Sequence, residues 1–207
     1  LNGEDSKGNG YISRLEPDAE RSTLNYIDGR RQGIPLKAPR GLAVFGDVLY
    51  VADVKTVRRF KASSGEHLGD VELPGAVLLT DVAVAVDGSV YVADIGSEAS
   101  EASVADTGSD AIYHISPAGQ VSVVARRPNL GAPYALAANE TGLWITCSGS
   151  NELLLLVPAA DGEAVADAGR LALSVRAPRG IVAIPDGTFV ISSEATGTVY
   201  RGYRDGP

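Results

Sequence analysis

The sequence has little of the material from which most metal and catalytic sites are built. Its 207 residues include one cysteine, Cys147, two histidines, His67 and His114, and no methionine. A single cysteine excludes an internal disulfide, and no Cys/His cluster has the spacing of a zinc site. No GxSxG motif is present, so nothing points to Ser-His-Asp catalysis. The sequence therefore gives no support to a zinc site or to a Ser-His-Asp triad.

Long apolar runs are also missing. The longest, residues 153–157, has the length of a strand and falls far short of the roughly 18 residues that a membrane-spanning helix needs. With 44% hydrophobic and 21% charged residues, the composition is that of a globular protein. Because the chain begins at Leu1 and not at a methionine, we expect either a processed N-terminus or a piece of a longer chain.

Positive charge is absent from the middle of the chain. Residues 62–125 contain ten Asp and Glu and no Lys or Arg, within a net charge of −8 for the whole sequence. Such an acidic sector repels nucleic acid phosphates and attracts cations or a basic protein face. A solvated surface that only gives solubility explains the same charges.

What the sequence does contain is a long repeat. Each copy begins with an apolar stretch, continues through a turn that includes glycine or aspartate, and returns in a second apolar stretch. The first-strand stretches start at Arg40, Asp81, Tyr134 and Arg179, so the copies are 41, 53 and 45 residues apart. The turns at 46–47, 87–88, 141–142 and 186–187 are typical of tight hairpins. A third strand follows in every copy, and a fourth closes the complete copies.

Four antiparallel strands in about 45 residues are typical of a β-propeller blade. We therefore predict an all-β fold, a single β-propeller domain over residues 1–207. Its full blades span 37–75, 76–128 and 129–175, and partial blades span 1–36 and 176–207. The first strands are apolar almost throughout, which predicts that they are buried on both faces near the propeller axis.

The segments 38–60 (APRGLAVFGDVLYVADVKTVRRF) and 81–97 (DVAVAVDGSVYVADIGS) resemble NHL repeats and the SMP-30/gluconolactonase/LRE-like propellers. The resemblance implies a fold that usually has six blades and that serves lactonases, other hydrolases and binding scaffolds alike. In the hydrolases, it implies a divalent cation at the mouth of the central channel, held by Glu, Asn and Asp side chains at the starts of the innermost strands.

Arg40, Asp81, Tyr134 and Arg179 occupy those matching positions and are the candidate channel-mouth residues. Only Asp81 supplies an oxygen of the kind that calcium or magnesium prefers. Tyr134 stands where the family often has asparagine, and Arg179 where aspartate is usual. The two arginines could bind a carboxylate or phosphate, pair with Asp81, or cap strand ends.

Acidic residues also occur in two other places, at the ends of the second strands and in an insertion. Asp53 and Asp94 recur at the same blade position in a YVAD sequence, which favours a turn or capping role. The stretch 96–110 is an insertion that begins at Gly96. Its acidic residues, Glu98, Glu101, Asp106 and Asp110, could gather around Ca²⁺ or another divalent cation, form the contact surface for a partner, or lie in a plain acidic loop.

These observations favour a non-catalytic propeller that acts as a binding or scaffold module with a protein partner, as part of a larger assembly in the periplasm or outside the cell. The alternative is a divalent-metal-dependent lactonase or related hydrolase in which Asp81 is a ligand.

Overall fold

The computed structural model describes residues 9–16, 22–31, 33–96, 110–126, 130–158 and 165–203, and it is made of strands joined by turns. No helix that could cross a membrane occurs in these residues. The strands are β1 (Tyr11–Leu15), β2 (Ser22–Asp28), β3 (Pro39–Phe45), β4 (Val48–Asp53), β5 (Thr56–Lys61), β6 (His67–Glu72), β7 (Leu79–Val84), β8 (Val90–Asp94), β9 (Ala111–Ile115), β10 (Val121–Arg126), β11 (Pro133–Asn139), β12 (Gly142–Cys147), β13 (Glu152–Pro158), β14 (Val165–Ala172), β15 (Pro178–Ala183), β16 (Thr188–Ser193) and β17 (Thr198–Tyr203).

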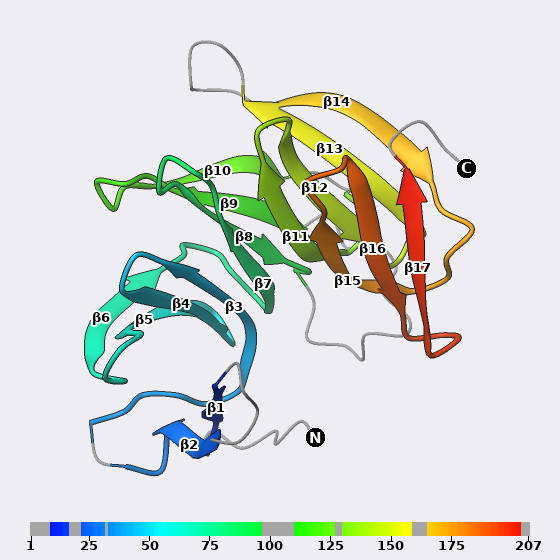
Figure 1. Cartoon of the computed structure of the whole chain (residues 1–207). Coiled ribbons are helices and arrows are strands. Elements are labelled where there is room, and N and C mark those ends of the chain that lie inside the picture. The colour runs from blue at the N-terminus through cyan, green and yellow to red at the C-terminus, as the bar shows by residue number, and fades with distance from the viewer. Residues whose placement is uncertain are drawn as a thin grey trace.

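The strands form antiparallel sheets in chain order. Three sheets have four strands each, β3–β6, β7–β10 and β11–β14; β15–β17 form a three-stranded sheet, and β1 pairs only with β2 among the described strands. The first strands of neighbouring sheets pack against one another, β3 on β7, β7 on β11 and β11 on β15, and the sheets follow one another as blades around an arc (Figure 1). The all-β propeller predicted from the repeat is confirmed.

The hairpin turns follow from local chemistry. Gly88 and Gly187 have φ angles of 86° and 85°, a region that glycine enters without strain. The aspartate before each glycine accepts a hydrogen bond from the backbone N–H two residues later, Asp87 from Ser89 and Asp186 from Thr188, both at 2.9 Å. The side chain therefore fixes the turn that joins the first strand to the second.

The core lies between the blades, with one cluster in each interface. Ala52 and Val57 of the β3–β6 blade pack against Val92 and Tyr113 of the next blade. Ile112 and Ile145 lie in the cluster that fills the following interface. Each blade is too thin to bury its own apolar faces, so its stability comes from its neighbours.

The expectation that the first strands are buried on both faces is wrong for β3 and for β15. Leu42 and Val44 on β3 are 48% and 59% exposed, and Val182 on β15 is 61% exposed. The β1–β2 sheet contributes Ile12 and Ile27 to a cluster with buried side chains of β4 and β5, the middle strands of the first complete blade. Among the described residues it supplies no strand that covers β3, which leaves the apolar side of β3 in solvent.

Candidate functional site

The four candidate channel-mouth residues line one cavity of about 360 Å³. Each stands second or third in the first strand of its blade, on β3, β7, β11 and β15 respectively. Because these strands pack side by side, the four residues at equivalent positions of the repeat lie around the same cavity. The lining residues are Arg40, Gly41, Thr80, Asp81, Tyr134, Ala135, Arg179 and Gly180.

Asp81 ties two blades together at this cavity. Its Oδ1 accepts the N–H of Val82 at 2.8 Å, and its Oδ2 accepts the N–H of Leu136 on β11 at 2.9 Å. Burial raises the pKa of Asp81 to about 6, although both backbone hydrogen bonds act in the opposite direction. Loss of hydration therefore outweighs the two donors that hold the carboxylate.

The shifted pKa of Asp81 predicts a pH-dependent stability. An acid that holds its proton more tightly in the folded state contributes stability below its unfolded pKa, near 4, and loses that contribution as the pH rises through about 6. A shift of roughly two units corresponds to about 3 kcal/mol. We expect urea unfolding of the wild type to show this loss between pH 4 and 7, and Asp81→Asn to lack it. Equal pH profiles for the two proteins would contradict the assignment to Asp81.

Arg179 is held on two sides. Its guanidinium carbon lies 4.0 Å from the centroid of the Tyr134 ring, and its Nε donates to Glu194 Oε2 at 2.8 Å, with a second bond from Nη2 to the same oxygen. Stacking on an aromatic ring together with a forked contact fixes the plane of the guanidinium. Arg179 therefore pairs with Glu194 and not, as considered from the sequence, with Asp81.

A divalent cation does not fit this donor set. Each oxygen of Asp81 already accepts a backbone N–H, and the equivalent positions in the other blades carry two arginines and a tyrosine. No group of three or more Asp, Glu, His or Cys side chains suited to a metal occurs in the described part of the chain. Calcium prefers six to eight oxygen ligands, and two guanidinium groups beside it would repel it.

The two recurrent aspartates of the YVAD sequence anchor the starts of their own blades. Asp53 accepts hydrogen bonds from the backbone N–H of Lys37 at 3.1 Å and of Ala38 at 2.6 Å. Asp94 does the same for Val77 and Leu78, at 3.1 and 2.7 Å. Both aspartates are fully buried and hold the segment that leads into the first strand. This contact is the capping role that recurrence in the repeat favours.

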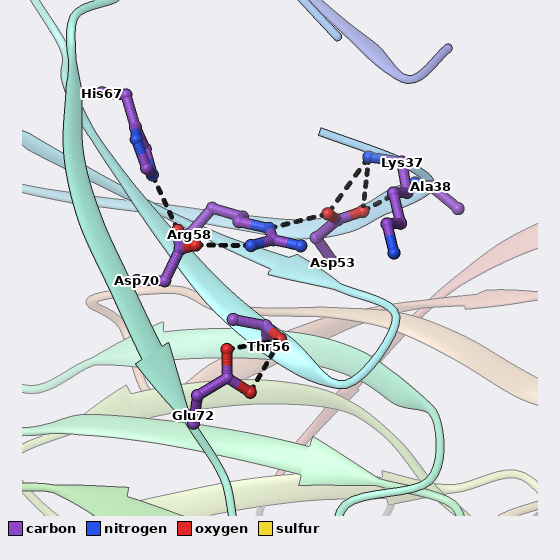
Figure 2. Close-up of polar contacts among 8 residues, drawn as sticks. All are labelled: Lys37, Ala38, Asp53, Thr56, Arg58, His67, Asp70 and Glu72. Atoms are coloured by element: carbon purple, nitrogen blue, oxygen red, sulfur yellow. Dashed lines mark hydrogen bonds and ion pairs between the residues drawn. The ribbon is translucent and has the colours of Figure 1, made fainter. Parts of the chain in front are cut away.

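Asp53 also belongs to a chain of charged groups in the β3–β6 blade (Figure 2). Arg58 donates from Nε to Asp53 at 2.9 Å and from Nη1 to Asp70 at 2.5 Å, and His67 Nε2 lies 2.7 Å from the other oxygen of Asp70. On the same blade Thr56 donates to Glu72. These charged groups join β4, β5 and β6, and their contacts hold the outer strands of the blade together.

The insertion is described only at its two ends. Gly96 has a φ of 56°, and its N–H donates to Asp94 at 3.2 Å. Asp110 is buried, and its Oδ2 accepts the N–H of Ala132 at 2.8 Å. Glu98, Glu101 and Asp106 lie outside the described residues, so a metal or partner site on the insertion stays a prediction.

Two residues that contact Arg179 beside the cavity were not predicted from the sequence. Glu194, which follows the second strand of its blade, is the partner of Arg179. Thr146 donates from its hydroxyl to the carbonyl oxygen of Arg179 at 3.1 Å and so joins the last two blades. Thr80 makes a similar contact between the two preceding blades, where it donates to Pro133 at 3.1 Å, but it lies on a first strand and Thr146 on a second, so the repeat gives no signal for Thr146.

No protein-family model matches the sequence, and no curated protein sequence matches it either. Solved structures do resemble it. A streptogramin B lyase superposes with a TM-score of 0.62 at 16% identity, over 84% of this chain and 54% of its own. A gluconolactonase-like protein gives 0.61 at 17%, over 79% and 62%. The nidogen structure solved in a nidogen/laminin complex gives 0.69 at 16%, over 97% and 73%.

These neighbours differ in function, and at 16–17% identity the likeness shows the fold alone. The chain spans little more than half the length of the streptogramin B lyase. The blade sheets and the solved neighbours together make the chain a β-propeller protein.

Proposed function

We propose that the chain is a non-catalytic binding module that recognises a protein partner through the mouth of the propeller. The observation that carries the proposal is the set of side chains at one repeat position, Arg40, Asp81, Tyr134 and Arg179, around one cavity. The single carboxylate in that set is engaged by two backbone N–H groups. Charged and aromatic groups in fixed positions suit recognition of a ligand better than chemistry on a metal-bound substrate.

Two further observations support a protein as the ligand. The apolar side chains Leu42 and Val44 follow Arg40 on β3 and are exposed, which is typical of surfaces that bind another protein. The nidogen propeller, whose fold is similar, was solved in a complex with laminin. Membership of the NHL or SMP-30-like family, and a location outside the cytoplasm, stay proposals of the same kind, supported by the resemblance of residues 38–60.

The hydrolase alternative makes the opposite prediction about metals. We expect calorimetric titration of the full chain with Ca²⁺, Mg²⁺ and Zn²⁺ to show no stoichiometric binding at the mouth, because the donor set there repels a cation. Asp81→Ala is the test variant, and Asp186→Ala, which removes an exposed turn carboxylate, is the matched control. Tight metal binding that is lost only in Asp81→Ala would contradict the proposal and favour a metal-dependent lactonase.

A further inference from the structure

The first strand of the first complete blade exposes a side chain that the other blades bury. The register between first and second strands puts four residues at one position of the repeat, Leu42, Val82, Leu136 and Ile181. The last three are 3%, 5% and 9% exposed, whereas Leu42 is 48% exposed. Each of these three buried side chains lies in the cluster that its blade shares with the blade before it. A preceding blade is therefore what buries this position.

The part of the preceding blade that covers this position is its inner half. In the three complete interfaces, β7 packs against β3 and β4, β11 against β7 and β8, and β15 against β11 and β12. Each of these first strands thus contacts both the first and the second strand of the blade before it. Among the described strands, only the two-stranded β1–β2 sheet precedes β3. The neighbours that β3 lacks are therefore one first strand and one second strand.

The β1–β2 sheet covers the same face of the blade, but only farther out. Leu49 and Val51 on β4 stand opposite Val44 and Leu42 of β3 in the strand register. Both β4 side chains are buried in one cluster with Ile12 of β1, while the two β3 side chains are exposed. A single face is thus covered at β4 and bare at β3.

The order of β1 and β2 shows which edge borders the bare part. The Tyr26 hydroxyl of β2 donates to the carbonyl oxygen of Ala62, in the turn that joins β5 to β6, at 3.1 Å. Gly10, immediately before β1, lies against the start of β3, because a Cβ added there would be 2.6 Å from Pro39 Cδ. The two strands lie beyond the β3–β6 blade at the end of the arc (Figure 1), and β1 pairs with no described strand except β2. The free edge of β1 therefore borders the bare part of the face.

We propose that the protein partner supplies a two-stranded antiparallel segment that stands as the first and second strands before β1 and β2 and covers Leu42 and Val44. Its outer strand pairs with the free edge of β1 through backbone hydrogen bonds, and its inner strand packs on β3. The inference rests on the proposed function, since it names the part of the partner that is recognised. A whole blade of a second copy does not fit, because β1 and β2 already occupy the places of its outer strands.

The β7–β8 hairpin of this chain is a model for that segment. Ala83 on β7 and Ala93 on β8 lie in one cluster with Leu136 of β11, the residue that corresponds to Leu42. A synthetic peptide of residues 79–94, acetylated and amidated, therefore presents a face that already packs on a leucine at this position. Its Asp-Gly turn favours the hairpin.

The test is an NMR titration of the full ¹⁵N-labelled chain with this peptide. We expect the peptide to shift the amide signals of Leu42, Val44 and Ile12, and to slow hydrogen exchange of the β1 amides that are not bonded to β2. The same peptide with Ala83→Asn and Ala93→Asn is expected to bind at least about tenfold more weakly, because it would bury amide groups without hydrogen-bond partners.

Variants of the chain locate the binding surface. Leu42→Glu is expected to weaken peptide binding at least about tenfold, because it puts a charge under the added strands, and Val44→Glu is a second variant of the same face. Leu68→Glu is the matched control, since Leu68 lies on the outer strand β6 and is 42% exposed, close to the value for Leu42. All three side chains are largely exposed, so we expect the variants to fold, which urea unfolding checks.

The inference is overturned if the peptide does not bind at millimolar concentration, if the alanine and asparagine peptides bind equally, or if Leu42→Glu and Leu68→Glu have equal effects. Sedimentation of the chain alone tests the other occupant. A dimer that Leu42→Glu abolishes and Leu68→Glu keeps would mean that a second copy covers β3, and would also overturn the inference. None of these results decides whether the chain is a binding module, because that proposal is decided by the metal titration.

Discussion

Replacing Asp53 with alanine is expected to lower the free energy of unfolding by about 3–5 kcal/mol, the cost of removing one partner of a buried ion pair. Asp53 is fully buried, and its carboxylate accepts the N–H groups of Lys37 and Ala38 and the Nε–H of Arg58. The alanine variant leaves these donors without that acceptor inside the blade. Arg58 retains Asp70, which keeps the cost from rising further.

Asp94→Ala is the matched control for this prediction. Asp94 is as deeply buried and caps Val77 and Leu78 in the same way, but its hydrogen bonds come from backbone N–H groups. We expect a cost of about 2–3 kcal/mol for its loss, that of unsatisfied buried donors. The difference between the two variants, measured by urea unfolding at pH 7, then reports on Arg58. Equal costs would show that the ion pair contributes nothing beyond the cap.

A double-mutant cycle with Arg58→Met isolates the pair itself. Removing Arg58 alone leaves Asp53 buried without its side-chain donor, whereas removing both groups leaves neither charge unmatched. We expect Asp53→Ala with Arg58→Met to cost less than the sum of the two single variants. Strict additivity would contradict a direct interaction between Asp53 and Arg58.

The repeat made much of this fold predictable. Arg40, Asp81, Tyr134 and Arg179 were placed at one position of four copies by sequence alignment alone, and the structure brings all four to one cavity. The reason is physical. In a propeller, equivalent residues of the first strands converge near the axis, so residues at the same position of the repeat lie close together in the fold. The capping role of Asp53 and Asp94 was predictable on the same ground.

Contacts that break the repeat were not predictable. The third complete blade has Cys147 where the first two have aspartate, and the N–H of Ala132 is bound instead by Asp110, from the end of the insertion in the preceding blade. In the last blade, Asn151 of the blade before binds the N–H of Ala177. Both substitutes come from neighbouring blades, and nothing in a single copy of the repeat points to them. The exposure of Leu42 was not predicted because the burial of a first strand depends on the neighbouring blade that covers it, and the pattern of β3 itself does not show whether such a neighbour is present.

The second large effect is expected for Trp144→Ala, which should lower the free energy of unfolding by about 3–5 kcal/mol, as for other buried aromatic side chains cut to alanine. Trp144 on β12 is 5% exposed, and its ring lies 4.6 Å from that of Phe189 on β16, in the cluster between the last two blades. Its indole N–H donates to Thr141 at 3.0 Å. Trp144→Phe keeps a ring in this interface and is expected to cost about 1–2 kcal/mol, because it loses volume and one hydrogen bond.

Trp144 also links stability to the mouth of the propeller. The interface that it fills carries the Tyr134–Arg179 stack and the hydrogen bond from Thr146 to the carbonyl of Arg179, so a loosened interface moves Arg179 relative to β11. Trp144→Ala should therefore shift the NMR signal of the Arg179 Nε–H group under conditions where the variant is folded. Tyr113→Ala, which removes a buried ring between the first two complete blades, should cost similar stability and leave that signal unchanged. Equal shifts in the two variants would mean that the mouth responds to stability in general, whereas a shift confined to Trp144→Ala would mean that the packing of two blades sets the position of the arginine between them.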